Sequence, residues 1–258
     1  MKTIIVLFLF CSCSLFRGSK NIDEEKHAHI NSIPTKKDYI DQLASLGDIL
    51  LELEDIKFLR LNRDSEAYLV GIYNKIVNSN EVILKKRSSI AKFYIIESKH
   101  PFYFSLPKSQ FFLSSGLLKK YVKTEGVLIS ILSHEILKSI NSIYKKTLVV
   151  PTGFLTIEKV LSLTKIDLKE KMNVNKWTYF ALRRAGYDPI IYLNWIQIQN
   201  KNTLDFTYQL GSSAQISKEE FLFKTFLSSV KDSNIDYRNL ANNSSKGFYS
   251  FISKIKRM

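Results

Sequence analysis

The chain has few cysteines, few acidic residues and no long hydrophobic run. Only two of its 258 residues are cysteines, Cys11 and Cys13, and both lie close to the N-terminus. If one of them is lipidated, no free pair is left for an internal disulfide, and stability must then come from the core. The apolar run over residues 3–10 is too short to span a bilayer, and no second candidate span follows. No internal repeat is present.

Acidic residues are outnumbered by basic ones, 24 Asp and Glu against 38 Lys and Arg, which gives a formal net charge of +14. The lysines are spread along the chain beside Ile, Asn and Ser, whereas a nucleic-acid-binding protein concentrates its charge in a stripe with interleaved aromatics. We therefore expect no nucleic-acid partner. Weak attraction to an anionic membrane surface needs only net charge and is compatible with this composition.

The N-terminus has the pattern of a bacterial lipoprotein signal. A short apolar leader ends at a small residue, Ser12, which stands directly before Cys13. We expect a signal peptide over residues 1–12, lipidation at Cys13 with Cys11 as the second candidate, and anchorage to a membrane of the cell envelope, on its periplasmic side or outer surface. The alternative is a short buried N-terminal helix or strand.

Residues 13–35 are polar and charged without apolar periodicity, which predicts a flexible tether between the lipid and the folded body. His27 and His29 lie in this segment. A His pair with this spacing can bind a metal, but in a tether it is more often incidental. The remaining residues, 36–258, are the predicted folded domain.

That domain is predicted to be α+β and mainly helical, with a small antiparallel-type sheet. Apolar residues at spacings of three and four predict a long amphipathic helix over residues 39–61. Runs of β-branched and aromatic residues, separated by Pro101 and Pro107, predict strands. The predicted strands cover 82–84, 91–96, 102–106 and 111–113. Further helices are predicted over 65–77, from Gly116, over 124–144 with Thr124 as N-cap, over 157–163, over 168–184 closed by Gly186, and over 188–199, 217–230 and 247–255. A polar loop is predicted over 201–215.

One segment, residues 133–138, resembles part of a zinc-protease helix. The pattern His-Glu-x-x-His places two histidines one helical turn apart, so that both imidazoles face the same metal. Here His134 and Glu135 are in place, but Lys138 stands where the second histidine belongs. A His-Glu pair alone is common by chance, and His134 would then be an ordinary core histidine.

The neighbouring segments strengthen this interpretation. Upstream lie Phe-Ser-Leu-Pro at 104–107 and Gly-Leu-Leu at 116–118, and downstream lies Ala-Gly-Tyr-Asp-Pro at 185–189. This order resembles the HtpX-type zinc metallopeptidases, the family that includes the CAAX prenyl protease and periplasmic outer-membrane assembly proteases. The resemblance covers residues 80–230 and implies a zincin-like fold with a peptide-binding cleft.

In that family two helix histidines and a downstream glutamate hold zinc, and the glutamate of the first helix activates the bound water. Carried over by the resemblance, His134 is the first ligand, Glu135 is the general base, and the other two ligand positions fall on Lys138 and Asn173. The remaining matches are Phe104, Pro107 and Gly116 for the cleft, Lys108 and Ser109 for a Gly-Gly pair at the substrate-binding edge strand, Asn175 for an acid, and Gln215 for a histidine.

Catalytic zinc normally has three protein ligands and a water, and only one of the three expected ligands is retained here. An ammonium has no lone pair to donate, so the losses should forfeit most of the roughly 10 kcal/mol or more of tight zinc binding. We therefore expect no cofactor. As a replacement, the ammonium of Lys138 is predicted to neutralise Glu135, three residues earlier, with Asn173 accepting a hydrogen bond from Lys138 or His134.

The resemblance thus implies a non-catalytic, lipid-anchored protein that binds a polypeptide or an envelope protein through the retained cleft. One alternative is an active zinc metalloendopeptidase with non-standard ligands, for which His100, Glu158 and Glu170 are the candidate substitutes. A further alternative is a structural lipoprotein with no cleft function.

Overall fold

The structure, a computed structural model, describes residues 35–82, 84, 90–145, 155–230 and 244–257. The expected signal peptide, the lipidation candidates Cys13 and Cys11, His27, His29 and nearly all of the expected tether lie outside the described residues. Within the described part of the chain, no helix combines the length and the apolar character needed to cross a membrane.

The chain divides into a unit Met1–Asp38 and a unit Tyr39–Met258. Of the first unit only residues 35–38 are described; there the hydroxyl of Thr35 donates to the carboxylate of Asp38 over 2.7 Å. All of the strands and the candidate site belong to the second unit.

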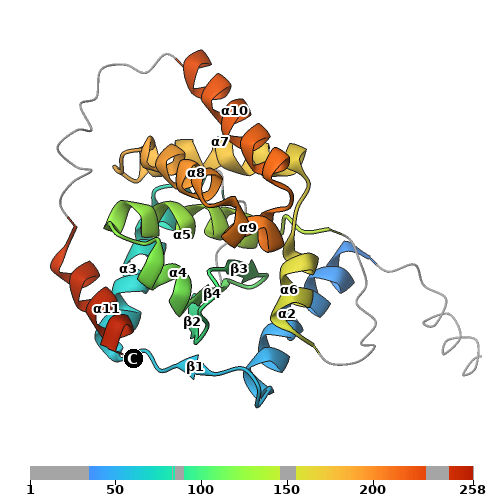
Figure 1. The fold of residues 1–258 in the computed structure, drawn as a ribbon, viewed down its shortest axis with the longest axis vertical. Helices are drawn as coiled ribbons and strands as arrows, with labels where there is room; N and C mark the ends of the chain where they lie inside the picture. Colours follow the sequence, from blue (N-terminus) through green and yellow to red (C-terminus); the bar gives the residue numbers. More distant parts are fainter. Residues whose placement is uncertain (1–34, 83, 85–89, 146–154, 231–243, 258) are drawn as a thin grey trace, which may run out of the picture. The chain divides into compact units, whose positions relative to one another are not determined.

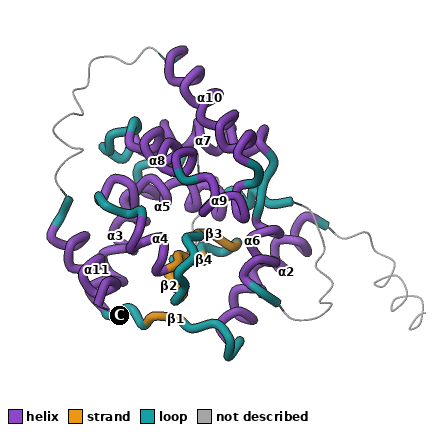
Figure 2. The backbone as a smooth tube through the Cα atoms, viewed as in Figure 1, coloured by secondary structure: helices purple, strands orange, loops and turns teal. Residues whose placement is uncertain are grey.

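Across the described residues the chain forms ten helices and a small four-stranded mixed sheet, so the prediction of a mainly helical α+β fold is confirmed. Helices dominate the backbone in Figure 2, and the strands are confined to one region. The helices are α2 (Lys36–Glu52), α3 (Arg63–Asn78), α4 (Ser115–Lys120), α5 (Glu125–Ile140), α6 (Ile157–Thr164), α7 (Leu168–Arg184), α8 (Ile191–Lys201), α9 (Thr203–Leu210), α10 (Ser213–Ser229) and α11 (Lys246–Arg257).

The first helix ends earlier than predicted. Helix α2 ends at Glu52, and the chain then turns into strand β1 (Phe58–Leu59). The apolar residues after Glu52 keep their spacing but divide between two cores: Phe58 packs against the cluster that contains α2, and Leu59 packs against the main core. Spacing over so few residues does not distinguish a helix from an irregular segment that ends in a strand.

The polar loop predicted over residues 201–215 is also wrong, because α9 and the start of α10 occupy it. Phe206 anchors α9 by complete burial, and Gly211 separates the two helices at a φ of 104°. Ser212 and Gln215 then form a capping box at the start of α10. This Ser-x-x-Gln pattern is a helix-start signal that is visible in the sequence.

The sheet has the strand order β1-β2-β4-β3, with β2 at Lys92–Ile96, β3 at Tyr103–Leu106 and β4 at Gln110–Ser114. It is mixed, because β2 pairs with β4 in parallel, whereas β1 with β2 and β3 with β4 are antiparallel. The predicted antiparallel-type sheet is therefore corrected. No strand forms from the described residues at 82–84, where Val82 is 90% exposed in a turn.

A tight turn joins β3 to β4. Lys108 and Ser109 both have positive φ, 62° and 57°. Two successive residues in the left-handed region are typical of a type I′ hairpin turn, where glycine carries the least strain. These are the two positions that the resemblance matched to a Gly-Gly pair.

Helix α5 lies between the sheet and the helices of the C-terminal half. It contacts β3 on one side and α7 and α8 on the other, and Figure 1 shows this layering. The helix is apolar nearly all round, and every residue from Val127 to Ser139 is buried. A helix covered on both faces is expected to be hydrophobic around its circumference, so the polar residues on α5 need a specific explanation.

Candidate functional site

Helix α5 carries three ionisable side chains into the interior. His134, Glu135 and Lys138 are 4%, 3% and 5% exposed. Thr124 stands at the N-cap position, as predicted, but its side chain makes no capping hydrogen bond, and the helix ends at Ile140 rather than at residue 144. Buried charges are costly unless they are paired and hydrogen-bonded, so the partners of these three residues determine what the site can do.

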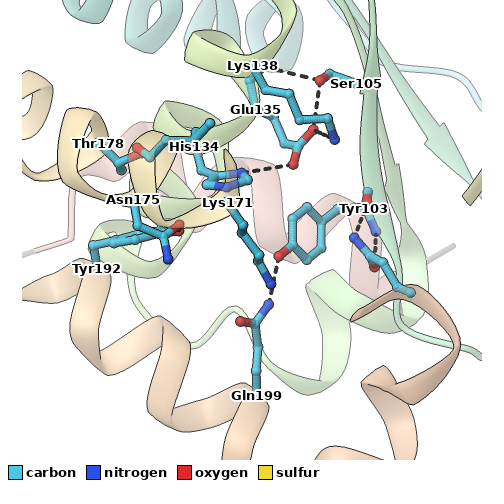
Figure 3. Close-up of polar contacts among 12 residues, drawn as sticks. Tyr103, Ser105, His134, Glu135, Lys138, Lys171, Asn175, Thr178, Tyr192 and Gln199 are labelled. Atoms are coloured by element: carbon cyan, nitrogen blue, oxygen red, sulfur yellow. Dashed lines mark hydrogen bonds and ion pairs between the residues drawn. The ribbon is translucent and has the colours of Figure 1, made fainter. Parts of the chain in front are cut away.

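The carboxylate of Glu135 is bound on both oxygens (Figure 3). Its Oε2 accepts from the ammonium of Lys138 over 2.9 Å and from the hydroxyl of Ser105 over 2.7 Å. Its Oε1 lies 3.0 Å from Nδ1 of His134. The pairing predicted between Lys138 and Glu135 is therefore present, but the contribution of Ser105 from β3 was not predicted.

Burial by itself would raise the pKa of Glu135. The ammonium of Lys138, followed by the imidazole of His134 and the hydroxyl of Ser105, outweighs it and lowers the pKa to about 2. A carboxylate with so low a pKa and with both oxygens occupied is a poor general base, because efficient proton transfer near neutral pH needs a pKa closer to the working pH.

The other ring nitrogen of His134 differs from the first. Nδ1 faces a carboxylate and therefore acts as a donor, whereas Nε2 is buried and has no hydrogen-bond partner among the described residues. The ring is stacked on Tyr192 at a centroid distance of 6.0 Å and an interplanar angle of 13°. The imidazole is thus held in one orientation with one polar atom free.

Helix α7 contributes a lysine to the site. Lys171 lines the same small cavity as His134, Glu135 and Lys138. Its ammonium pairs with Glu219, which is 2% exposed on α10. Asn173 is half-buried, is not among the cavity-lining side chains in the described part of the chain, and bonds there to neither Lys138 nor His134. The α7 position that faces the cavity beside His134 is thus that of Lys171.

Asn175 belongs to a second buried network on α7. Its amide donates to Glu219 over 2.9 Å, and its carbonyl oxygen accepts from the hydroxyl of Tyr192 over 2.6 Å. The sequence offered one signal that Lys171 belongs with Asn175: the two lie one helical turn apart and therefore on the same face of α7. No sequence signal identified Glu219, because its approach depends on how α10 packs.

The charged side chains of α5 and α7 line the smaller of two hollows. This small cavity has a volume of about 40 Å³, and its lining includes Lys165 and Gln209 as well as the apolar side chains of Leu161, Ile166 and Leu210. A groove of about 520 Å³ lies next to it and shares Leu161 and Gln209 with it. The groove is within the range of small-molecule and peptide sites, whereas the cavity holds only a few water molecules or one small group.

The groove lies at the start of β3, where His100, Pro101 and Phe102 line it together with side chains of α6 and α9. The side-chain amide of Gln209 accepts from the backbone N–H of Tyr103 over 3.2 Å and donates to its carbonyl. The hydroxyl of Tyr144 donates to the carbonyl of Ser105 over 3.2 Å. Side chains thus occupy positions on β3 that a neighbouring strand would otherwise pair with.

The three residues predicted for the cleft lie elsewhere. Phe104 stacks on Phe112 in the core at a centroid distance of 4.7 Å, and Pro107 is buried. At Gly116 a Cβ atom would lie 2.4 Å from the carbonyl oxygen of Lys99, so the glycine allows two backbone segments to approach. None of these three is among the side chains lining the two hollows of the described chain.

The residues at the site do not fit a divalent metal. The described chain contains no group of three or more His, Cys, Asp or Glu side chains able to hold one. Lys138 and Lys171, which line the same cavity as His134, carry ammonium groups with no lone pair to offer a metal. The substitute candidates do not change this: His100 and Glu158 line the larger groove, and Glu170 is exposed at the start of α7.

No protein-family model matches the sequence, and a search of curated proteins found no significant match. The interpretation of the site therefore depends on its own geometry and on the order of the motifs.

Proposed function

We propose that this chain is a catalytically inactive, lipid-anchored relative of the HtpX-type zinc metallopeptidases, which binds polypeptides of the cell envelope without cleaving them. The observation that carries this proposal is the state of Glu135. Both of its oxygens are bound by Lys138, His134 and Ser105 in a buried network. A residue that must take a proton from water cannot do so while its lone pairs serve as acceptors for an ammonium and a hydroxyl.

The local geometry supports a relation to that family. The retained His-Glu pair lies on a buried helix packed against the edge strand β3, and the hairpin turn after β3 has two left-handed residues where the family pattern has two glycines. The second ligand position holds Lys138, and the cavity-facing position on α7 holds Lys171. A fixed ammonium in each place substitutes for the charge of a cation without its Lewis acidity.

Peptide binding is supported by the groove next to the start of β3. Its volume of about 520 Å³ suits a short extended segment, and its walls include apolar side chains such as Ile56, Phe102 and Leu161. Edge strands bind extended peptides through backbone hydrogen bonds. A peptide that pairs with Tyr103 would first displace the side chain of Gln209, which now satisfies that residue.

The alternative, an active zinc metalloendopeptidase with non-standard ligands, is favoured by one observation. Nε2 of His134 is buried without a partner in the described part of the chain, and this is the kind of atom that a metal would bind. Metal content and cleavage distinguish the two functions.

The test measures zinc by elemental analysis and cleavage of fluorescent casein with the purified full-length protein. We expect no stoichiometric zinc and no cleavage. The variant with Lys138→His, Lys171→Glu and Glu219→Gln should gain zinc, because it adds two donors to His134 and removes the acid that pairs with Lys171.

The matched control carries Lys138→His and Asn173→Glu, which adds a glutamate to the same helix outside the cavity, and it should stay metal-free. One zinc per wild-type chain, or casein cleavage that Glu135→Gln abolishes, would refute the proposed inactivity. Failure of the first variant to bind zinc while it remains folded would count against descent from a zinc site.

A further inference from the structure

We propose that the small cavity under α5 binds a carboxylate group, and that this carboxylate belongs to a polypeptide lying in the adjoining groove. The identity of the carrier rests on the proposed function, but the anion site itself does not. The chemistry of the cavity is opposite to that of a metal site, because three lysines and a single carboxylate, that of Glu135, line it, where a metal would need anionic or neutral ligands.

The charges of the cavity do not balance. Lys138 is paired with Glu135, and Lys171 with Glu219. Lys165, which caps the C-terminal end of α6, also lines the cavity and has no carboxylate partner among the described residues. One positive charge is therefore uncompensated in a partly enclosed space, where an anion gains more from it than in open water.

The surroundings of Lys165 show the same imbalance. Burial lowers the pKa of its ammonium, and the like charges of Lys145 and Lys171 lower it further. Each of these effects disfavours the charged form, and an anion placed among these ammonium groups would relieve the repulsion between them.

A second, independent feature also points into this cavity. His134 is 4% exposed, lines the cavity, and presents a buried Nε2 that has no partner among the described residues. Buried polar atoms are nearly always satisfied, so such an atom indicates a missing ligand or water. A water that donates to Nε2 and to a carboxylate would satisfy both groups.

The size of the cavity selects a small group. A volume of about 40 Å³ corresponds to roughly three water positions at 10–15 Å³ each, enough for a carboxylate with one water and too little for a larger anion. Lysine ammonium groups bind such oxygens through short, charge-assisted hydrogen bonds. The carboxylate is either the C-terminus of a bound chain or the side chain of an internal Asp or Glu.

The groove supplies the route for the carrier. It shares Leu161 and Gln209 with the cavity, so a chain lying in the groove can place one end or one side chain among the three lysines. Gln209 lines both spaces, and its side-chain amide bonds to the backbone of Tyr103 as a peptide group would. Displacement of its amide by a peptide would open the groove toward the cavity.

The first experiment titrates acetate into the full-length protein and follows the imidazole resonances of His134 by NMR. We expect a saturable shift. Lys165→Gln should weaken acetate binding about fivefold or more, because it removes the unpaired cation and leaves both ion pairs intact. Lys169→Gln, the same change at an exposed position on α7, should leave it unchanged. The absence of a saturable shift, or equal affinity in Lys165→Gln, overturns the anion site.

The second experiment distinguishes the sources of the carboxylate by fluorescence polarisation with three labelled peptides. These are Ala-Val-Val-Val-Ala with a free C-terminus, the same peptide as its amide, and Ala-Val-Glu-Val-Ala amide. A preference of about tenfold or more for the first over the second, lost in Lys165→Gln, identifies a C-terminal carboxylate. A similar preference for the third over the second identifies a side-chain carboxylate.

The outcomes separate this inference from the proposed function. Equal binding of the three peptides overturns the carboxylate role of the cavity but leaves peptide binding standing. Saturable binding of acetate with no binding of any peptide supports the anion site and refutes the carrier. Binding of neither refutes both.

Discussion

Breaking the buried pair of Lys138 and Glu135 from one side should strongly destabilise the fold. Lys138→Met leaves the carboxylate of Glu135, 3% exposed, with only His134 and Ser105 as partners. Removal of one member of a buried ion pair typically costs about 3–5 kcal/mol, because the remaining charge is uncompensated. The pKa of Glu135 falls from 4.5 to about 2, which corresponds to about 3 kcal/mol of linked stability and agrees with that range.

The assay is a double-mutant cycle measured by urea denaturation. Lys138→Met should lower the free energy of unfolding by about 3 kcal/mol or more, whereas Glu135→Gln with Lys138→Met should be more stable than Lys138→Met alone, since no buried charge is left unpaired. A matched control is Lys108→Met. Its ion pair with Asp41 has side chains 59% and 46% exposed, so the loss should be below about 1 kcal/mol.

Two results would refute this reasoning. Lys138→Met could cost no more than Lys108→Met, which would mean that the buried carboxylate finds other compensation. The two changes could also be additive, which would mean that the residues do not interact energetically.

Two further predictions concern pH and backbone packing. Because the pKa of Glu135 is depressed in the folded state, its contribution to stability is complete above about pH 4.5 and is lost as the pH falls toward about 2. Over that window the free energy of unfolding of the wild type should fall more steeply than that of the double variant Glu135→Gln with Lys138→Met. Urea denaturation at several pH values measures both, and parallel curves would contradict the prediction. Gly116→Ala should destabilise by about 2 kcal/mol or more, since its Cβ would lie 2.4 Å from a backbone oxygen. Gly71→Ala, on the exposed face of α3, should stabilise by about 0.5–1 kcal/mol, because among the described residues its Cβ would meet nothing within 4 Å beyond its own stretch of helix. Thermal melts that show the same sign for both would refute the packing argument.

Much of the secondary structure followed from the sequence alone. The helices predicted over 157–163 and 168–184 correspond to α6 and α7, and Gly186 has the expected left-handed conformation, with a φ of 72°. The strands predicted over 91–96, 102–106 and 111–113 match β2, β3 and β4 within two residues. These are segments in which side-chain periodicity, β-branching and chain punctuation act locally, so no distant contact is needed to specify them.

The sequence also specified part of the site. The spacing of Glu135 and Lys138 on one helix was sufficient to predict their pairing, because residues three apart on a helix are neighbours. It was equally sufficient to place an ammonium where a second histidine would bind metal. Whether that helix was buried could not be read from these residues.

Tertiary structure determined everything that depends on segments far apart in the chain. Ser105 reaches Glu135 from β3, and Glu219 neutralises Lys171 from α10. The rotation of α7 directs Lys171 rather than Asn173 to the cavity, and the position of Gln209 closes the edge of β3. Local periodicity fixes which residues share a face of a helix, but packing against other elements decides what that face meets, and that determines the charge balance of the cavity.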